Sequence, residues 1–172
     1  MKKYSAYLLI AMGCFAGAAH ANSDVKFAGS VSNTTCDLIP DTGISGVAGL
    51  LQLGTVAPSA VGTAKEVVLR LDNNQAGCAA LPDAAIATIS WMGNLDSRGV
   101  INQNGTASDA WVRFTTVNAE GGTQADITST KSSADFIGST LKADGAKFSA
   151  VLNGGTNPGT FVSASAFVVS YP

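Results

Sequence analysis

The chain has 172 residues, of which 46% are hydrophobic and 13% are charged, and its formal net charge is −2. If residues 1–21 are removed as a leader, 151 residues remain, with 8 of the 10 basic residues against 12 acidic ones and a formal charge of −4. This size suits one domain with a sizeable core, and an acidic chain without a basic cluster argues against nucleic acid as a partner.

The first 21 residues have the pattern of a secretory signal peptide. Lys2 and Lys3 precede a 14-residue apolar stretch at Ala6–Ala19, and the triplet that ends at Ala21 has small residues at its first and third positions. The stretch is too short to span a bilayer as a helix. An alternative is lipidation of Cys14, but this would leave a shorter apolar segment than such signals prefer. We therefore expect an exported protein that starts at Asn22.

The exported chain keeps two cysteines, Cys36 and Cys78, because Cys14 is removed with the leader. In an oxidising compartment they are expected to form a disulfide, which would stabilise the fold by about 4 kcal/mol in the chain-entropy model. A metal-binding or redox pair is the alternative. It lacks a CxxC spacing, and the one histidine, His20, is removed with the leader.

Apolar residues along the exported chain recur with a period of two, which predicts an all-β protein. Glycine- and asparagine-rich turns separate the alternating segments, so a β-sandwich of short antiparallel strands is expected. Two segments, 41–49 and 132–146, remain unassigned, and the second fits either a short helical turn or a loop. The predicted strands are 25–31, 67–71, 85–92, 111–115, 125–130, 147–152 and 160–171.

Three parts of the chain carry a resemblance to a known family. Residues 23–31 alternate around a glycine shortly before Cys36, and Leu51-Gln52-Leu53-Gly54 precedes Cys78. At the C-terminus, Phe167, Val169 and Tyr171 alternate up to a penultimate tyrosine, and Gly159 is fourteenth from the end. In motif and spacing the chain resembles the pilins of chaperone/usher fimbriae, including those of type 1 pili and of enterotoxigenic strains, in which 51–54 would be the second strand.

The resemblance implies an incomplete immunoglobulin-like β-sandwich that lacks its last strand and is completed in trans by a donor strand. Residues 22–34 would be the N-terminal donor-strand extension and 35–172 the pilin domain. The implied donor residues are Val25, Phe27, Gly29 and Val31, and the implied strand beside the groove contains Gly159, Phe167, Val169 and Tyr171. The alternative is that residues 25–31 pack as an ordinary first strand of their own domain.

The implied partners are a periplasmic fimbrial chaperone, an outer-membrane usher and neighbouring copies of this or related pilins. The route runs through the periplasm to a fimbria on the cell surface, where the subunit would support adhesion to host cells. The pattern does not distinguish a major from a minor subunit.

The sequence contains no recognisable catalytic set, so no enzyme activity, cofactor or metal is expected. The alternative function is that the subunit itself binds host glycans. In that case Trp91 and Trp111 would stack on sugar rings, and Arg98, Arg113 or Lys131 would meet an acidic sugar. Against this interpretation, a tryptophan in a sandwich strand usually belongs to the core, and single basic residues are usually solvated.

Overall fold

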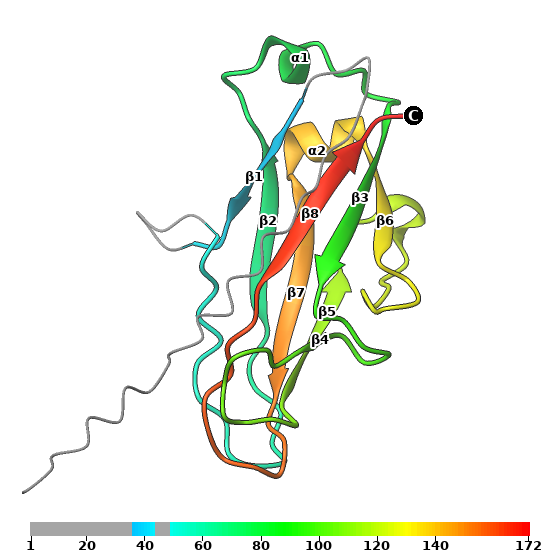
Figure 1. Ribbon diagram of the computed structural model, residues 1–172. Coiled ribbons are helices and arrows are strands. Elements are labelled where there is room, and N and C mark those ends of the chain that lie inside the picture. Colours follow the sequence, from blue (N-terminus) through cyan, green and yellow to red (C-terminus); the bar gives the residue numbers. More distant parts are fainter. Residues whose placement is uncertain (1–35, 44–48) are drawn as a thin grey trace, which may run out of the picture.

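The computed structural model describes residues 36–43 and 49–172, which form two antiparallel sheets packed face to face (Figure 1). The larger sheet has the strand order β1-β2-β7-β5-β4, and the smaller has the order β6-β3-β8. The strands of the larger sheet are β1 (Leu38–Asp41), β2 (Lys65–Leu71), β7 (Ala146–Asn153), β5 (Trp111–Thr116) and β4 (Val100–Ile101). Those of the smaller sheet are β6 (Ser133–Ile137), β3 (Ile86–Gly93) and β8 (Ser165–Ser170).

Among residues 36–43 and 49–172, helical structure is confined to short pieces in the connections. These are α1 (Ala76–Ala79), the 3₁₀ turn η1 (Glu120–Gly122) and α2 (Gly138–Ala143). Among the described residues, no helix has the length and apolar character needed to cross a membrane. The predicted all-β, immunoglobulin-like sandwich is therefore confirmed as a fold class.

Aromatic side chains from both sheets fill the core. Phe148 of β7 is fully buried and lies with its ring centre 5.1 Å from that of Phe114 and 5.2 Å from that of Trp91. Phe136 of β6 approaches the same ring at 5.4 Å. Because alternate residues of each strand face inward, the period-two pattern of the sequence places these rings in one layer between the sheets.

Cys36 and Cys78 form a disulfide, as predicted. Cys78 lies in α1, so the bond ties the residue before β1 to the connection between β2 and β3. Both cysteines are buried. The side chain of Gln75 also holds this junction, because it accepts a hydrogen bond from the Asp37 amide and donates one to the Asp37 carboxylate.

Two predicted strands are wrong. Residues 125–130 form only an isolated bridge between Asp126 and Thr115, because just two backbone hydrogen bonds join this segment to β5 before the chain crosses to the smaller sheet. Residues 51–54 form no strand, although Leu51 and Leu53 pack against the core, because no ladder joins their backbone to another described segment. The unassigned segment 132–146 contains β6 and α2.

The other predicted strands within the described residues are confirmed, with shifted ends. β2, β3, β5 and β7 correspond to the predicted segments, and β8 is the C-terminal half of the segment predicted at 160–171. The predicted strand at 25–31 lies outside the described residues, as does most of the unassigned segment 41–49.

Candidate functional site

The most distinctive feature of the fold is strand β8, which lies at the edge of the smaller sheet. Figure 1 shows it in red beside β3, in front of the larger sheet. Its ladder partner among the described residues is β3, and its opposite side has none. An edge strand of this kind presents backbone donors and acceptors to any chain that can pair with it.

The register identifies the outward backbone groups. Phe167 lies opposite Trp91, and Val169 lies opposite Ile89. The Trp91 amide donates to the Ser132 carbonyl on the β6 side, so Trp91 and Ile89 direct their backbone groups away from β8. In such non-hydrogen-bonded pairs the backbone N–H and C=O groups of the two residues point away from each other. The N–H and C=O groups of Phe167 and Val169 therefore face the open side of β8.

The residues that lead into β8 continue this pattern. Residues 102–107 bond the N–H and C=O groups of Val162 and the carbonyl of Thr160. They take the place that β3 has beside β8, because the ladder of β3 ends at Ser165. In an extended chain the backbone groups of alternate residues point to opposite sides, so Phe161 and Ser163 face the open side. We call the resulting row the open edge; it consists of the backbone groups of Phe161, Ser163, Ser165, Phe167 and Val169.

An apolar groove runs beside the open edge. Its larger hollow has a volume of about 590 Å³ and lies between residues 50–58 and residues 154–163. A smaller hollow of about 250 Å³ reaches Trp91 and Phe167 in the core. Residues common to both linings make them one continuous groove, namely Leu50, Leu51, Leu53, Phe161 and Ser163.

The groove lining, among the described residues, contains no acidic side chain, no basic side chain and no histidine. The surface offers apolar contact and backbone hydrogen bonding, which suit an extended peptide. The described part of the chain also holds no group of three potential metal ligands. General acid–base chemistry would require titratable side chains that the described groove lining lacks.

The four residues predicted for the groove strand take different positions. Phe167, Val169 and Tyr171 are partly buried and pack against the core from β8 and the residue that follows it. Gly159 lies in the loop before β8 and lines the larger hollow. A β-carbon at Gly159 would collide with the Thr106 hydroxyl and the Ala107 amide, so glycine allows the two segments to approach closely.

Tyr171, which follows β8, forms a hydrogen bond with Cys36 of the disulfide. Its hydroxyl donates a 2.9 Å hydrogen bond to the Cys36 carbonyl. Burial, with a smaller contribution from the nearby Asp37 carboxylate, raises the pKa of Tyr171 to about 12. The neutral phenol is therefore the form that the folded chain prefers.

We expect stability to fall as the pH rises above 10 because of Tyr171. The unfolded tyrosine loses its proton near pH 10 and the folded one near pH 12, so the contribution is complete below pH 10 and is lost as the pH rises to about 12. Tyr171 is the one tyrosine after residue 21, so the tyrosinate absorbance of a chain that starts at Asn22 reports it alone. A folded midpoint at pH 10 would contradict this assignment, and Tyr171→Phe should remove the absorbance change.

The residues considered for glycan contact do not form one site. Trp91 is 91% buried in the core, where its ring centre lies 4.8 Å from that of Phe114. Trp111 lies on the outer face of the larger sheet, and the guanidinium of Arg98 stands 5.4 Å from its ring centre. Arg98 also bonds Asp96, at 2.7 Å. One face of Trp111 is therefore covered by a cation that already has an acidic partner.

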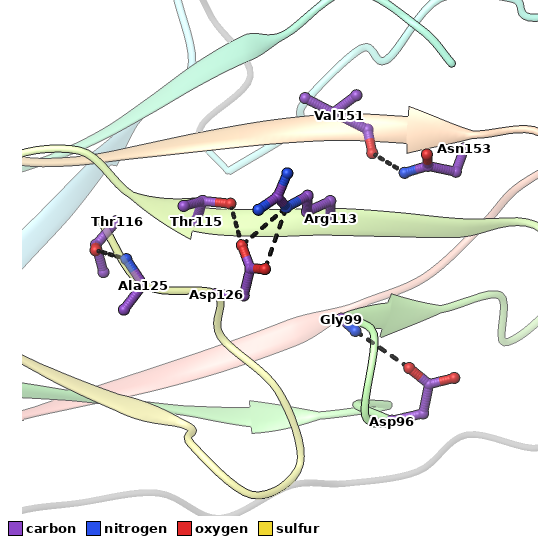
Figure 2. Close-up of polar contacts among 9 residues, drawn as sticks. All are labelled: Asp96, Gly99, Arg113, Thr115, Thr116, Ala125, Asp126, Val151 and Asn153. Carbon is purple, nitrogen blue, oxygen red and sulfur yellow. Dashed lines mark hydrogen bonds and ion pairs between the residues drawn. The ribbon is translucent and has the colours of Figure 1, made fainter. Parts of the chain in front are cut away.

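Arg113 is likewise paired on the same outer face. Figure 2 shows its guanidinium and the Thr115 hydroxyl on the Asp126 carboxylate, at 3.0 and 2.6 Å. Partial burial raises the pKa of Asp126, but the hydrogen bonds from Arg113 and Thr115 outweigh it, and the pKa lies below its ordinary value. Lys131 is exposed on a separate loop. The two arginines are thus neutralised by neighbouring carboxylates.

A comparison with known proteins identifies the family. The chain is 42% identical to the F107 fimbrial protein of Escherichia coli over 173 residues, which cover 99% of each protein. The chain belongs to the chaperone/usher family of fimbrial subunits. The resemblance seen in the sequence is thereby confirmed. No protein-family model matches the chain.

The sequence did not reveal one contact that supports the groove wall of the fimbrial subunit. Asn102 lies in a segment, 102–105, that reads as an ordinary turn, yet its side chain bonds the backbone of Val162, which is 60 residues away. Only a prediction of which loop faces the start of β8 would have found this contact. The glycine at position 105 was the available signal of a close approach.

Proposed function

We propose that the chain is a structural subunit of a cell-surface fimbria and polymerises by donor-strand exchange. Residues 22–34 of one copy lie along the open edge of the next, with Val25, Phe27 and Val31 directed into the groove. The observation that carries this proposal is the one-sided pairing of residues 161–169 above an apolar hollow. The incomplete edge is the reason that the subunit requires a partner.

The dimensions of the extension and the edge agree. From Phe161 to Val169 the open edge spans nine residues, and the extension from 22 to 34 has 13. A strand of this length offers about 30 Å of ladder at about 3.3 Å per residue. The extension also alternates apolar and polar residues, as a strand with one face in a groove and one in solvent requires.

Before assembly, the same edge needs temporary cover. A periplasmic chaperone would supply it, and an outer-membrane usher would be the place where the donor strand replaces the chaperone. The finished fimbria would support adhesion to host cells. The part of the subunit in this scheme is structural, because the described groove lining offers apolar contact and backbone hydrogen bonds to the donor strand.

Amide hydrogen exchange tests donor-strand binding directly. The acceptor is the exported chain with Phe27→Asp and Val31→Asp, because charged side chains on the inward face prevent its own extension from acting as a donor. The probe is a synthetic peptide of residues 22–34. We expect the amides of Phe167 and Val169 to exchange about 100-fold more slowly at a peptide concentration of about 100 Kd.

The neighbouring amides of Ala166 and Val168 serve as an internal control, because they already pair with β3 and should change less. A peptide with Gly29→Leu should protect poorly, since a glycine on the inward face marks a point where the groove is shallow. Equal protection by that peptide would show that the register is wrong. Unchanged exchange at Phe167 and Val169 with the natural peptide would overturn the proposal.

A further inference from the structure

The hydrogen-bonded support of β8 changes partway along the segment. The ladder between β3 and β8 ends at Gly93 and Ser165. Below this point, the backbone of Thr160 and Val162 is held by the loop 102–107. The loop 102–107 therefore supports residues 160–163, just as β3 supports β8.

The side chain of Asn102 is the centre of this support. Its carbonyl oxygen accepts hydrogen bonds from the amides of Gly105 and Val162, each at 2.9 Å. Its amide group donates to the carbonyls of Ala107 and Thr160, at 2.7 and 3.0 Å. The side-chain oxygen and nitrogen of Asn102 thus each bond one backbone group of the loop and one of the 160–162 segment.

The loop makes further contacts with Thr160 beside those of Asn102. The Thr106 hydroxyl accepts the Thr160 amide at 3.0 Å, and the Ala107 amide donates to the Thr160 carbonyl at the same distance. A β-carbon on Gly105 would collide with the Thr160 carbonyl, so the two backbones lie in direct contact. The loop is therefore specifically fitted to residues 160–162.

We propose that Asn102 is a positioning residue that lengthens the edge recognised by the donor strand from β8 down to Phe161. The inference rests on the proposed function and specifies the length of donor that the groove selects. With Asn102 in place, Phe161 and Ser163 present backbone groups beside the larger hollow. Without it, residues 160–163 lose their extended support and the donor pairs with β8 alone.

The experiment combines donor length with substitution of Asn102. Three peptides, of residues 22–34, 26–34 and 22–30, are titrated against the acceptor chain described above. One of the two shorter peptides lacks the end that lies at Phe161. In the acceptor with Asn102 intact, that peptide should bind about tenfold or more weakly than the full one, because it loses one or two backbone hydrogen bonds and the groove contact of one valine. The truncation should also remove protection of the Phe161 and Ser163 amides while leaving that of Phe167 and Val169.

In Asn102→Ala the same truncation should weaken binding clearly less than in the acceptor with Asn102 intact, because the backbone hydrogen bonds that it removes are already lost. The matched control is Asn118→Ala. Asn118 lies beside the start of β7, whereas the groove lies beside the end of that strand. Asn118 also bonds two backbone groups, the Gly145 carbonyl and the Lys147 amide, but neither lines the groove. Asn118→Ala should keep the tenfold effect of truncation.

Two further measurements protect the test against a variant that fails to fold. Thr106→Val removes the acceptor for the Thr160 amide and the contact between the two threonine hydroxyls, and it should reduce the truncation effect partially. Exchange at Phe161 and Ser163 needs no variant at all. If the full peptide protects Phe167 and Val169 but neither Phe161 nor Ser163, this inference is wrong and donor-strand exchange stands. If no peptide binds, the proposed function itself fails.

Discussion

Replacement of Phe148 by alanine is expected to remove about 3 to 5 kcal/mol of the free energy of unfolding. Phe148 is fully buried, and its ring packs against Phe114, Trp91 and Phe136, so the substitution opens a cavity between the two sheets. A loss of this size is a large share of the 5 to 15 kcal/mol that holds an ordinary domain together. Urea unfolding followed by tryptophan fluorescence measures it, because Trp91 touches the cavity.

The control substitution is Phe161→Ala. Phe161 is only partly buried and packs against the core in the wall of the groove. Its removal should cost about 1 to 2 kcal/mol, the value of a partly buried apolar side chain. Equal shifts of the urea midpoint for the two variants would show that the aromatic layer is not the principal support of the sandwich.

The strands that face the core on one side were predictable. In β7, for example, every second residue from Ala146 to Leu152 is buried, and this alternation is visible in the amino-acid letters. β6 was not predictable, because only Phe136 of its five residues is buried and the others give no clear period. The six-residue helix α2 is too short for a helical period to emerge.

The candidate site divides in the same way. The alternation of Phe167, Val169 and Tyr171 indicated an inward-facing C-terminal strand, and the structure places these side chains against the core. The function of Asn102 could not be predicted, because it depends on a contact with Val162 that only the folded chain creates. Similarly, the burial of Trp91 follows from the packing of three other rings around it.

The disulfide has a structural position that links stability to the groove. Cys36 precedes β1, the edge strand of the larger sheet, and its carbonyl accepts the Tyr171 hydroxyl from the end of β8. The bond to Cys78 fixes that carbonyl relative to α1. The covalent bond and the tyrosine contact therefore hold one end of both sheets together.

Replacement of both Cys36 and Cys78 by serine is expected to cost about 4 kcal/mol, since the bond closes a loop with a sequence separation of 42. The urea midpoint measures this loss. Gln75→Ala, which removes only exposed polar contacts with Asp37 at the same junction, should cost about 1 kcal/mol or less. Because freeing Cys36 also exposes the phenol that it holds, the Tyr171 pKa should move from about 12 toward its ordinary value in the double-serine variant. A lowered urea midpoint with an unchanged tyrosine titration would mean that β8 keeps Tyr171 buried by itself, without the disulfide.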